Sequence, residues 1–177
     1  MYRITRVAFL LVSLVLGACS TPYQSSGITG GYSERELEPA IWRVTFGGNG
    51  YTSVESAQTY WLYRCAELAL EHGFDGFEIL SNIQLIQRLP QPELKIAANS
   101  STIVPIYTGG GSLKPTIVGD IRLLHQPFTP TPPKVFEAVA LKAALSGFVT
   151  GDKCNLGNVC PHAHHYLYPG DKSATGG

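Results

Sequence analysis

Residues 42–73 read WRVTFGGNGYTSVESAQTYWLYRCAELALEHG, a short alternating segment followed by a long segment with helical spacing. Apolar and polar side chains alternate at the start, which predicts a strand with one buried face. Apolar residues then recur every three or four positions, which predicts an amphipathic helix over about 53–72. Thr52 and Glu55 match a capping box, and Gly73 is a natural stop. The apolar stripe of this helix comprises Val54, Ala57, Trp61, Cys65 and Leu68, widened by Leu62 and Ala69.

A second set of apolar residues with one parity follows this helix. Phe77, Ile79, Ile83 and Leu85 alternate with polar residues. This pattern predicts another strand, or two strands separated near residues 81–82.

Turn-forming residues divide the rest of the chain. Residues 89–100 contain two prolines among polar residues and predict a loop. Residues 102–107 and 116–125 are rich in β-branched side chains and flank a Gly-Gly-Gly-Ser run, which predicts a β-hairpin. Because Thr131 can cap a helix and a proline fits its first turn, a second helix is expected from there to about Leu145. Its apolar face would hold Val135, Ala138, Val139 and Leu145.

The order of these elements predicts an α+β fold. Two main helices would pack on one face of a mostly antiparallel sheet, which makes two layers. The length of 177 residues suits one domain with additional terminal segments. The predicted organisation is a leader at 1–18, a flexible tether at 19–31, the α+β domain at 32–149 and a Cys- and His-containing tail at 150–177.

The composition excludes some classes of protein. Hydrophobic residues make up 44% and charged residues 15%, which is typical of a globular rather than a disordered chain. Lys+Arg and Asp+Glu both number 13, so the formal net charge is zero. Because nucleic-acid binding relies on an excess of basic residues, we expect no nucleic-acid partner.

The first residues have the parts of an export signal. Arg3 and Arg6 precede an apolar run that is long enough for export but too short to span a bilayer. Leu16-Gly17-Ala18-Cys19 then resembles the lipobox of bacterial lipoproteins. In that family the cysteine thiol is acylated, so the resemblance implies that Cys19 anchors the chain to a lipid bilayer. Ser20, in place of an Asp that would favour retention in the inner membrane, implies an outer-membrane location. We expect the domain to face the periplasm.

Residues 30–80 carry a second resemblance. The matching segments are Gly-Tyr-Ser-Glu at 31–34, the alternating segment at 42–46, Gly48-Asn49 with Thr52, residues 60–68 and residues 73–77. In these segments the chain is similar to a family of small lipoproteins of Gram-negative bacteria. That family has no established activity, so the resemblance implies an envelope location and leaves the biochemical role open.

The glycine-rich turn after the first strand is a candidate anion site. Gly48, Asn49, Gly50 and Thr52 precede a helix, where backbone N–H groups can bind an anion. Neither Gly-Lys-Ser/Thr nor Gly-x-Gly-x-x-Gly is present, so neither nucleotide-binding motif is met. A tight capped turn is the alternative interpretation.

The C-terminal tail concentrates cysteine and histidine. Cys154 and Cys160 lie six positions apart, and an exported protein sits in an oxidising compartment, which favours a disulfide between them. His162, His164 and His165 follow closely, so a metal site that includes both cysteines is the alternative. This spacing matches no standard zinc pattern, and we expect neither a metal nor a cofactor.

The remaining reactive side chains are expected to be structural. Cys65 lies on the apolar stripe, so we expect it to be a buried free thiol. Arg64, Glu67 and Glu71 share one helix face and are expected to form a solvated ion-pair surface. A solvated position is also expected for Glu34, Glu36 and Glu38.

These patterns favour a protein without enzymatic activity, because no catalytic motif is present. The expected function is a membrane-anchored lipoprotein that binds an envelope protein or the cell wall, or has a structural role. The alternative is a periplasmic metal-binding protein that uses the Cys/His tail. A hydrolase whose catalytic residues meet only in the fold is a third hypothesis.

Overall fold

The computed structural model describes residues 21–88, 113–151 and 160–169. They form six strands and three helices. The strands are β1 (Gly31–Glu38), β2 (Ile41–Gly47), β3 (Gly76–Ile79), β4 (Gln84–Arg88), β5 (Lys114–Leu124) and β6 (Val135–Glu137). The helices are α2 (Val54–Glu71), α3 (Ala138–Thr150) and α4 (Ala163–Leu167).

One antiparallel sheet contains all six strands, and β5 is its central element. The strand order is β1-β2-β5-β3-β6, and β4 also pairs with β5. One edge of β5 pairs with β2, whereas the other edge pairs with β3 and then with β4. The apolar residues after α2 therefore form two strands interrupted near residues 81–82, which was one of the two predicted arrangements.

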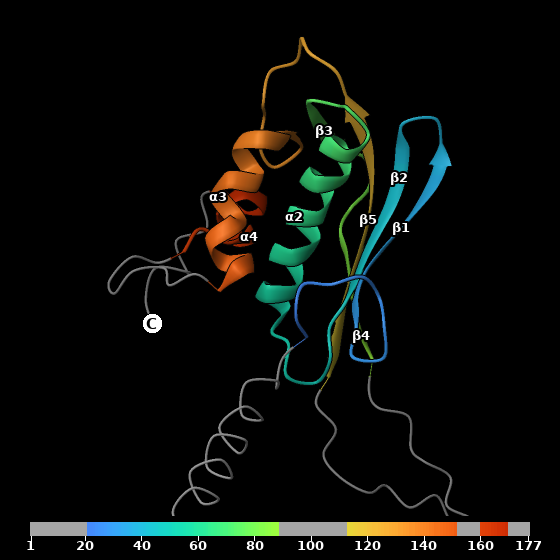
Figure 1. Cartoon of the computed structure of the whole chain (residues 1–177), viewed down its shortest axis with the longest axis vertical. Coiled ribbons are helices and arrows are strands. Elements are labelled where there is room, and N and C mark those ends of the chain that lie inside the picture. The colour runs from blue at the N-terminus through green and yellow to red at the C-terminus, as the bar shows by residue number, and fades with distance from the viewer. Residues whose placement is uncertain (1–20, 89–112, 152–159, 170–177) are drawn as a thin grey trace, which may run out of the picture.

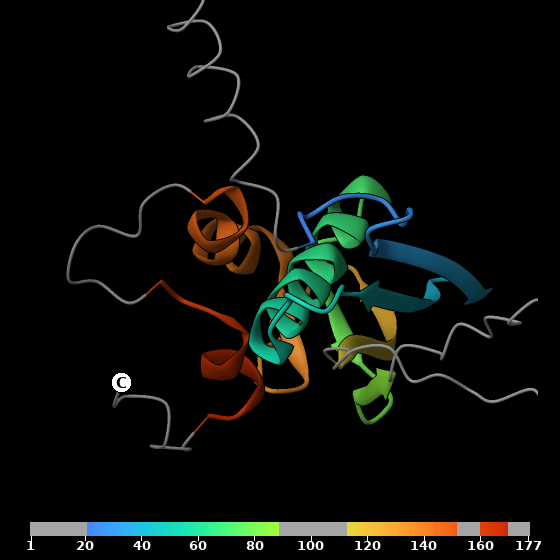
Figure 2. The same cartoon turned by 90° about the horizontal axis from the view of Figure 1, so that it is seen from below.

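The helices cover one face of the sheet, as Figures 1 and 2 show from two directions. α2 contacts β2 and β5, and α3 and α4 pack against α2. This arrangement confirms the predicted α+β class, with two main helices on one face of an antiparallel sheet.

Trp61 seats α2 on the sheet. Its side chain is fully buried, and its indole Nε1 donates a 2.9 Å hydrogen bond to the carbonyl of Val44 on β2. The ring lies directly over Gly119 of β5, where a Cβ atom would be 2.6 Å from the indole Cζ2. Most of the predicted stripe is buried with it, namely Ala57, Leu62, Cys65, Leu68 and Ala69.

The start of α2 is one residue later than the predicted cap. Ser53, not Thr52, accepts the capping hydrogen bond, from the backbone N–H of Ser56 at 3.0 Å. Thr52 instead contacts the N-terminal segment, as described below. Ser53 therefore caps the helix in place of the predicted Thr52.

The predicted start of the second helix at Thr131 is wrong. Val135–Glu137 form strand β6 against β3, and α3 begins at Ala138 with the Glu137 carboxylate as its cap. Val139, predicted to be on the buried face, is exposed, whereas Leu141 is buried. The open edge of β3 explains the difference. Pairing with β3 satisfies backbone N–H and C=O groups of residues 135–137, which would otherwise need partners within a helix.

The predicted hairpin is described in one half only. Its second segment forms β5, which begins at Lys114. The first segment, 102–107, and the predicted loop at 89–100 lie outside the described residues. Their predictions stay open.

Replacing Gly119 with Ala should destabilise the domain. The added Cβ would clash with the buried Trp61 ring, and overpacking of this kind costs about 1–3 kcal/mol. Urea unfolding followed by circular dichroism measures this loss. Gly47→Ala on β2 is the matched control, because a Cβ there meets only one atom, at 4.0 Å. Equal stability of the two variants would contradict the role given to Trp61.

Candidate functional site

The segment that precedes β1 is packed against the domain. Thr21 is fully buried, and its backbone N–H donates to the Thr52 hydroxyl at 3.2 Å. The Thr21 hydroxyl accepts a 2.8 Å hydrogen bond from the backbone N–H of Asn49 and donates to the carbonyl of Thr29 at 2.7 Å. Part of the predicted flexible tether at 19–31 is therefore packed against the domain. We call the contact of Thr21 with Asn49 and Thr52 the N-terminal junction.

The predicted anion-binding residues do meet, but the amides of Gly48, Asn49 and Thr52 already have acceptors. The Gly48 N–H donates to the carbonyl of Pro115 at 2.7 Å, and Asn49 N–H reaches the hydroxyls of Thr21 and Thr52. The Thr52 N–H donates to the carbonyl of Asn49 at 3.2 Å. This geometry favours the alternative interpretation, a capped turn that also receives the N-terminal segment.

Tyr23 fixes the N-terminal segment to α2. Its ring packs against three other tyrosines, Tyr32, Tyr60 and Tyr63, with centroid distances of 5.0, 5.8 and 5.1 Å. Its hydroxyl donates to a carboxylate oxygen of Glu67. Burial, reinforced by the neighbouring Glu67, raises the pKa of Tyr23 far above its usual value. The hydroxyl therefore remains a hydrogen-bond donor at any physiological pH.

Glu67 belongs to a charge cluster centred on the buried Arg64. The two terminal nitrogens of Arg64 bind both oxygens of Glu71 at 2.7 Å, and one of them lies 2.8 Å from Glu34. Glu67 lies 3.3 Å from the other nitrogen. Arg64 is only 5% exposed, so the prediction of a solvated ion-pair surface is wrong for this residue.

The cluster also explains why the inner face of strand β1 carries a glutamate. The alternation of apolar residues did not predict this strand. In the β1–β2 pair, Glu34 lies opposite the buried Val44 and faces Arg64, so this glutamate is not solvated as predicted. Tyr32 lies under the guanidinium at 4.5 Å. Glu36 and Glu38 are exposed, as predicted.

The electrostatics of the cluster favour its charged form. Burial alone lowers the pKa of Arg64, but hydrogen bonds to Glu71 and Glu34 outweigh this effect and raise it. The hydrogen bond from Arg64 lowers the pKa of Glu71. On α3, Lys142 lies 3.1 Å from Glu67, and this contact raises the pKa of Lys142. The cluster therefore links the N-terminal segment, β1, α2 and α3.

Replacing Arg64 with Met should destabilise the domain by about 3 kcal/mol, because three carboxylates would lose their shared cation. Arg43→Met is the matched control, since its pair with Asp120 is exposed to solvent and contributes little to stability. Urea unfolding of both variants at neutral pH makes the comparison. An equal loss for the two would contradict the structural role of the Arg64 cluster.

The tail contains a second group of polar residues around His162. This side chain is buried, and its Nδ1 lies 2.5 Å from a carboxylate oxygen of Glu55, without the alignment of a hydrogen bond. The His162 ring is 4.4 Å from that of His165 and 6.3 Å from that of His164. The next backbone N–H, of Ala163, donates to the Thr59 hydroxyl at 3.0 Å, which docks α4 on α2.

This group does not reproduce the metal site that was the alternative interpretation of the tail. Cys160 is disulfide-bonded, which removes its thiolate as a ligand. Within the ranges that the structure describes, no three His, Cys, Asp or Glu side chains have a geometry that could hold a metal ion. Cys154 lies outside those ranges, so its pairing with Cys160 stays a prediction. Cys65 is a buried free thiol, as predicted, and burial raises its pKa.

The docking of α4 should weaken in mild acid. Burial lowers the pKa of His162 below its ordinary value of 6.5, although Glu55 acts in the opposite direction. The unfolded chain therefore binds this proton more readily than the folded one, and stability falls as the pH drops below 6.5.

Hydrogen exchange of the α4 amides at about pH 7.5 and about pH 5.5, corrected for the intrinsic rate, measures this loss. His162→Gln should abolish the pH dependence, whereas His125→Gln, at an exposed position, should leave it unchanged. Protection that is independent of pH in the unsubstituted protein would contradict the expectation.

A cavity that the sequence did not indicate lies beside α4. Its volume is about 340 Å³, within the range of small-molecule sites. The turn between β3 and β4 forms one wall, and Lys134 and Tyr168 contribute polar groups. Three segments far apart in the chain form it, so no local pattern could have predicted it.

Comparisons of the chain with family models, curated proteins and solved structures found no match. The family resemblance of residues 30–80 therefore stays a prediction. Among the described residues, no helix combines the length and the apolar character that crossing a membrane requires.

Proposed function

We propose that the protein is a lipoprotein of the bacterial outer membrane, anchored through an acylated Cys19. Its α+β domain would face the periplasm and act as a binding or structural module without enzymatic activity. The partner would be another envelope protein or a cell-wall component, in addition to the lipid bilayer.

The observation that carries the proposal is the position of the lipobox relative to the folded domain. Cys19 lies outside the described residues, but Thr21, two positions later, is already buried in the N-terminal junction. Several acyl chains on one cysteine suffice for a stable anchor, because each buried methylene contributes about 0.8 kcal/mol. The chain thus passes directly from the motif for lipid attachment into the domain.

The assignment of a non-enzymatic role is supported by the partners of the charged side chains. The buried Arg64 pairs with Glu34, Glu67 and Glu71. On the open face of the sheet, Arg43 holds Asp120 through two hydrogen bonds and Arg122 pairs with Glu78. These charges hold structural elements together.

Metal binding by the tail has less support. It needs Cys160 as a ligand, and this cysteine is disulfide-bonded. It also needs His162, which is buried against α2. Native mass spectrometry of the exported protein, purified without chelator, would revive this alternative if it revealed a metal adduct.

Replacing Cys19 with Ser should abolish incorporation of labelled palmitate and release the protein from the membrane fraction. The measurement is metabolic labelling of cells that express the full chain, followed by fractionation. Cys154→Ser is the matched control, because it removes a cysteine but leaves the lipobox intact. Labelling that persists in Cys19→Ser would refute the proposed anchor.

The outer-membrane location has a separate test. Ser20→Asp should move the acylated protein to the inner membrane, because the residue after the cysteine directs sorting in the lipoproteins that the leader resembles. Density-gradient separation of the two membranes measures the shift. An unsubstituted protein that already fractionates with the inner membrane would disprove this location and leave the anchor itself intact.

A further inference from the structure

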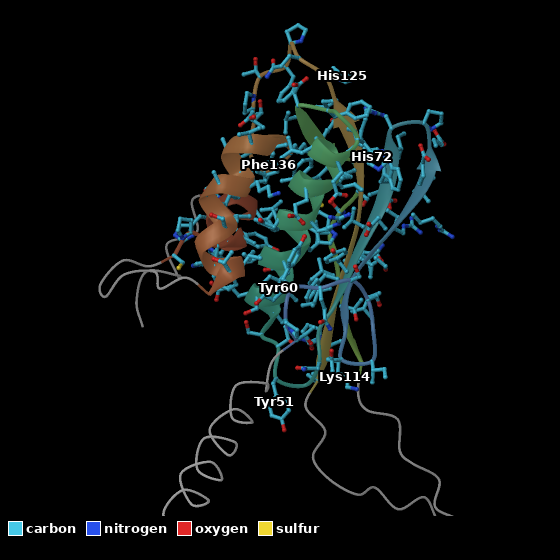
Figure 3. All side chains as sticks on the ribbon, viewed as in Figure 1. Tyr51, Tyr60, His72, Lys114, His125 and Phe136 are labelled. Atoms are coloured by element: carbon cyan, nitrogen blue, oxygen red, sulfur yellow. The ribbon has the colours of Figure 1, made fainter. Side chains whose placement is uncertain are left out.

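One end of the domain gathers the segments next to the N-terminal junction. We define this anchor-side end as residues 26–30, residues 48–53 and residues 113–116. Hydrogen bonds join the three segments. Gly48 N–H donates to the carbonyl of Pro115, and the Thr21 hydroxyl donates to the carbonyl of Thr29 and accepts from Asn49 N–H. Figure 3 shows Tyr51 and Lys114 at this end and His125 at the opposite end.

Apolar side chains project from the anchor-side end into solvent. Ile28, at the tip of its turn, is fully exposed, and Tyr51 is 75% exposed. They are the two most exposed large hydrophobic residues of the described chain, and Leu113 is 46% exposed. Single exposed hydrophobic residues are common on protein surfaces. Three of them on adjoining segments at one end form a surface that favours an apolar partner.

The charges of the two ends differ. The three segments of the anchor-side end contain no Asp or Glu, and Lys114 is exposed there. At the opposite end lie Glu36 and Glu38, at the end of β1, and Asp75, just after α2 (Figure 1). A bilayer with anionic headgroups attracts Lys and repels carboxylates. The anchor-side end therefore has the charge that suits such a surface, and the opposite end does not.

The N-terminal junction keeps the anchor-side end close to the anchor. Two extended residues span at most about 7 Å, so the Cα of Cys19 cannot lie farther than this from that of Thr21. Thr21 is hydrogen-bonded to Asn49 and Thr52, which belong to the anchor-side end. A lipid inserted at Cys19 would hold these residues at the membrane surface.

We propose that the anchor-side end rests in the headgroup layer of the bilayer, with Ile28, Tyr51 and Leu113 in contact with lipid. Tyrosine suits this layer, because its ring is apolar and its hydroxyl can remain in water. The β1–β2 hairpin then points away from the membrane and presents its acidic end to the periplasm. This inference rests on the proposed function, since it requires that Cys19 is acylated.

The test uses the full acylated protein in vesicles of phosphatidylethanolamine and phosphatidylglycerol. A nitroxide label is placed at Tyr51→Cys or Ile28→Cys on the anchor-side end, or at Leu37→Cys on β1 as the control near the opposite end. Electron paramagnetic resonance then measures collisions of each label with a water-soluble relaxing agent. The same labelled variants with Cys19→Ser, free in solution, supply the reference, and circular dichroism verifies that each variant is folded.

We expect vesicle attachment to lower the collision rate severalfold at positions 51 and 28 and to leave position 37 unchanged. In an acylated protein, an equal change of the collision rate on vesicle attachment at positions 51, 28 and 37 would overturn the inference and leave the lipid anchor standing. Mass spectrometry of the N-terminal peptide distinguishes failure of this inference from failure of the proposed function. Absence of acyl chains on Cys19 would overturn both together.

Discussion

A buried cation has to be paired with anionic groups that the fold brings to it. In this protein the buried cation is Arg64, and its pairing constrains the elements around it. Its partners come from α2 and, through Glu34, from β1. Glu67 extends the cluster to Tyr23 in the N-terminal segment and to Lys142 on α3. Because an unpaired buried charge is costly, these elements can occupy only the positions that keep the cluster complete.

The apolar pattern is sufficient to predict the parts of the fold that it dominates. β2 and α2 follow from it, since Val44, Phe46 and Trp61 are buried where the periodicity places them. The apolar pattern does not predict strand β1, because its inner face carries Glu34, whose partner Arg64 lies far along the chain. The segment Val135–Glu137 is compatible with a helix as a sequence, and only the open edge of β3 makes it a strand.

The residues of the candidate site also differ in how far the sequence predicts them. The proposed acylation of Cys19 rests on a local motif, because the residues that resemble a lipobox follow a segment that resembles an export signal. The packing of residues 21–30 cannot, since their small polar composition is that of a linker and their partners Asn49, Thr52 and Glu67 are distant in sequence. The burial of His162 likewise depends on Glu55 and Thr59 of α2, which no pattern in the tail reveals.

The position of β5 in the sheet also determines the order in which the domain can be completed. β5 pairs with β2 along one edge and with β3 and β4 along the other, yet all three precede it in the chain. Until residues 114–124 have been synthesised, each of these strands keeps an edge without that partner, and such edges are prone to pair with other chains. Contacts between distant segments also form slowly. The sheet therefore cannot join β2 to β3 and β4 until its central strand is present, and only β6 follows that strand in the chain.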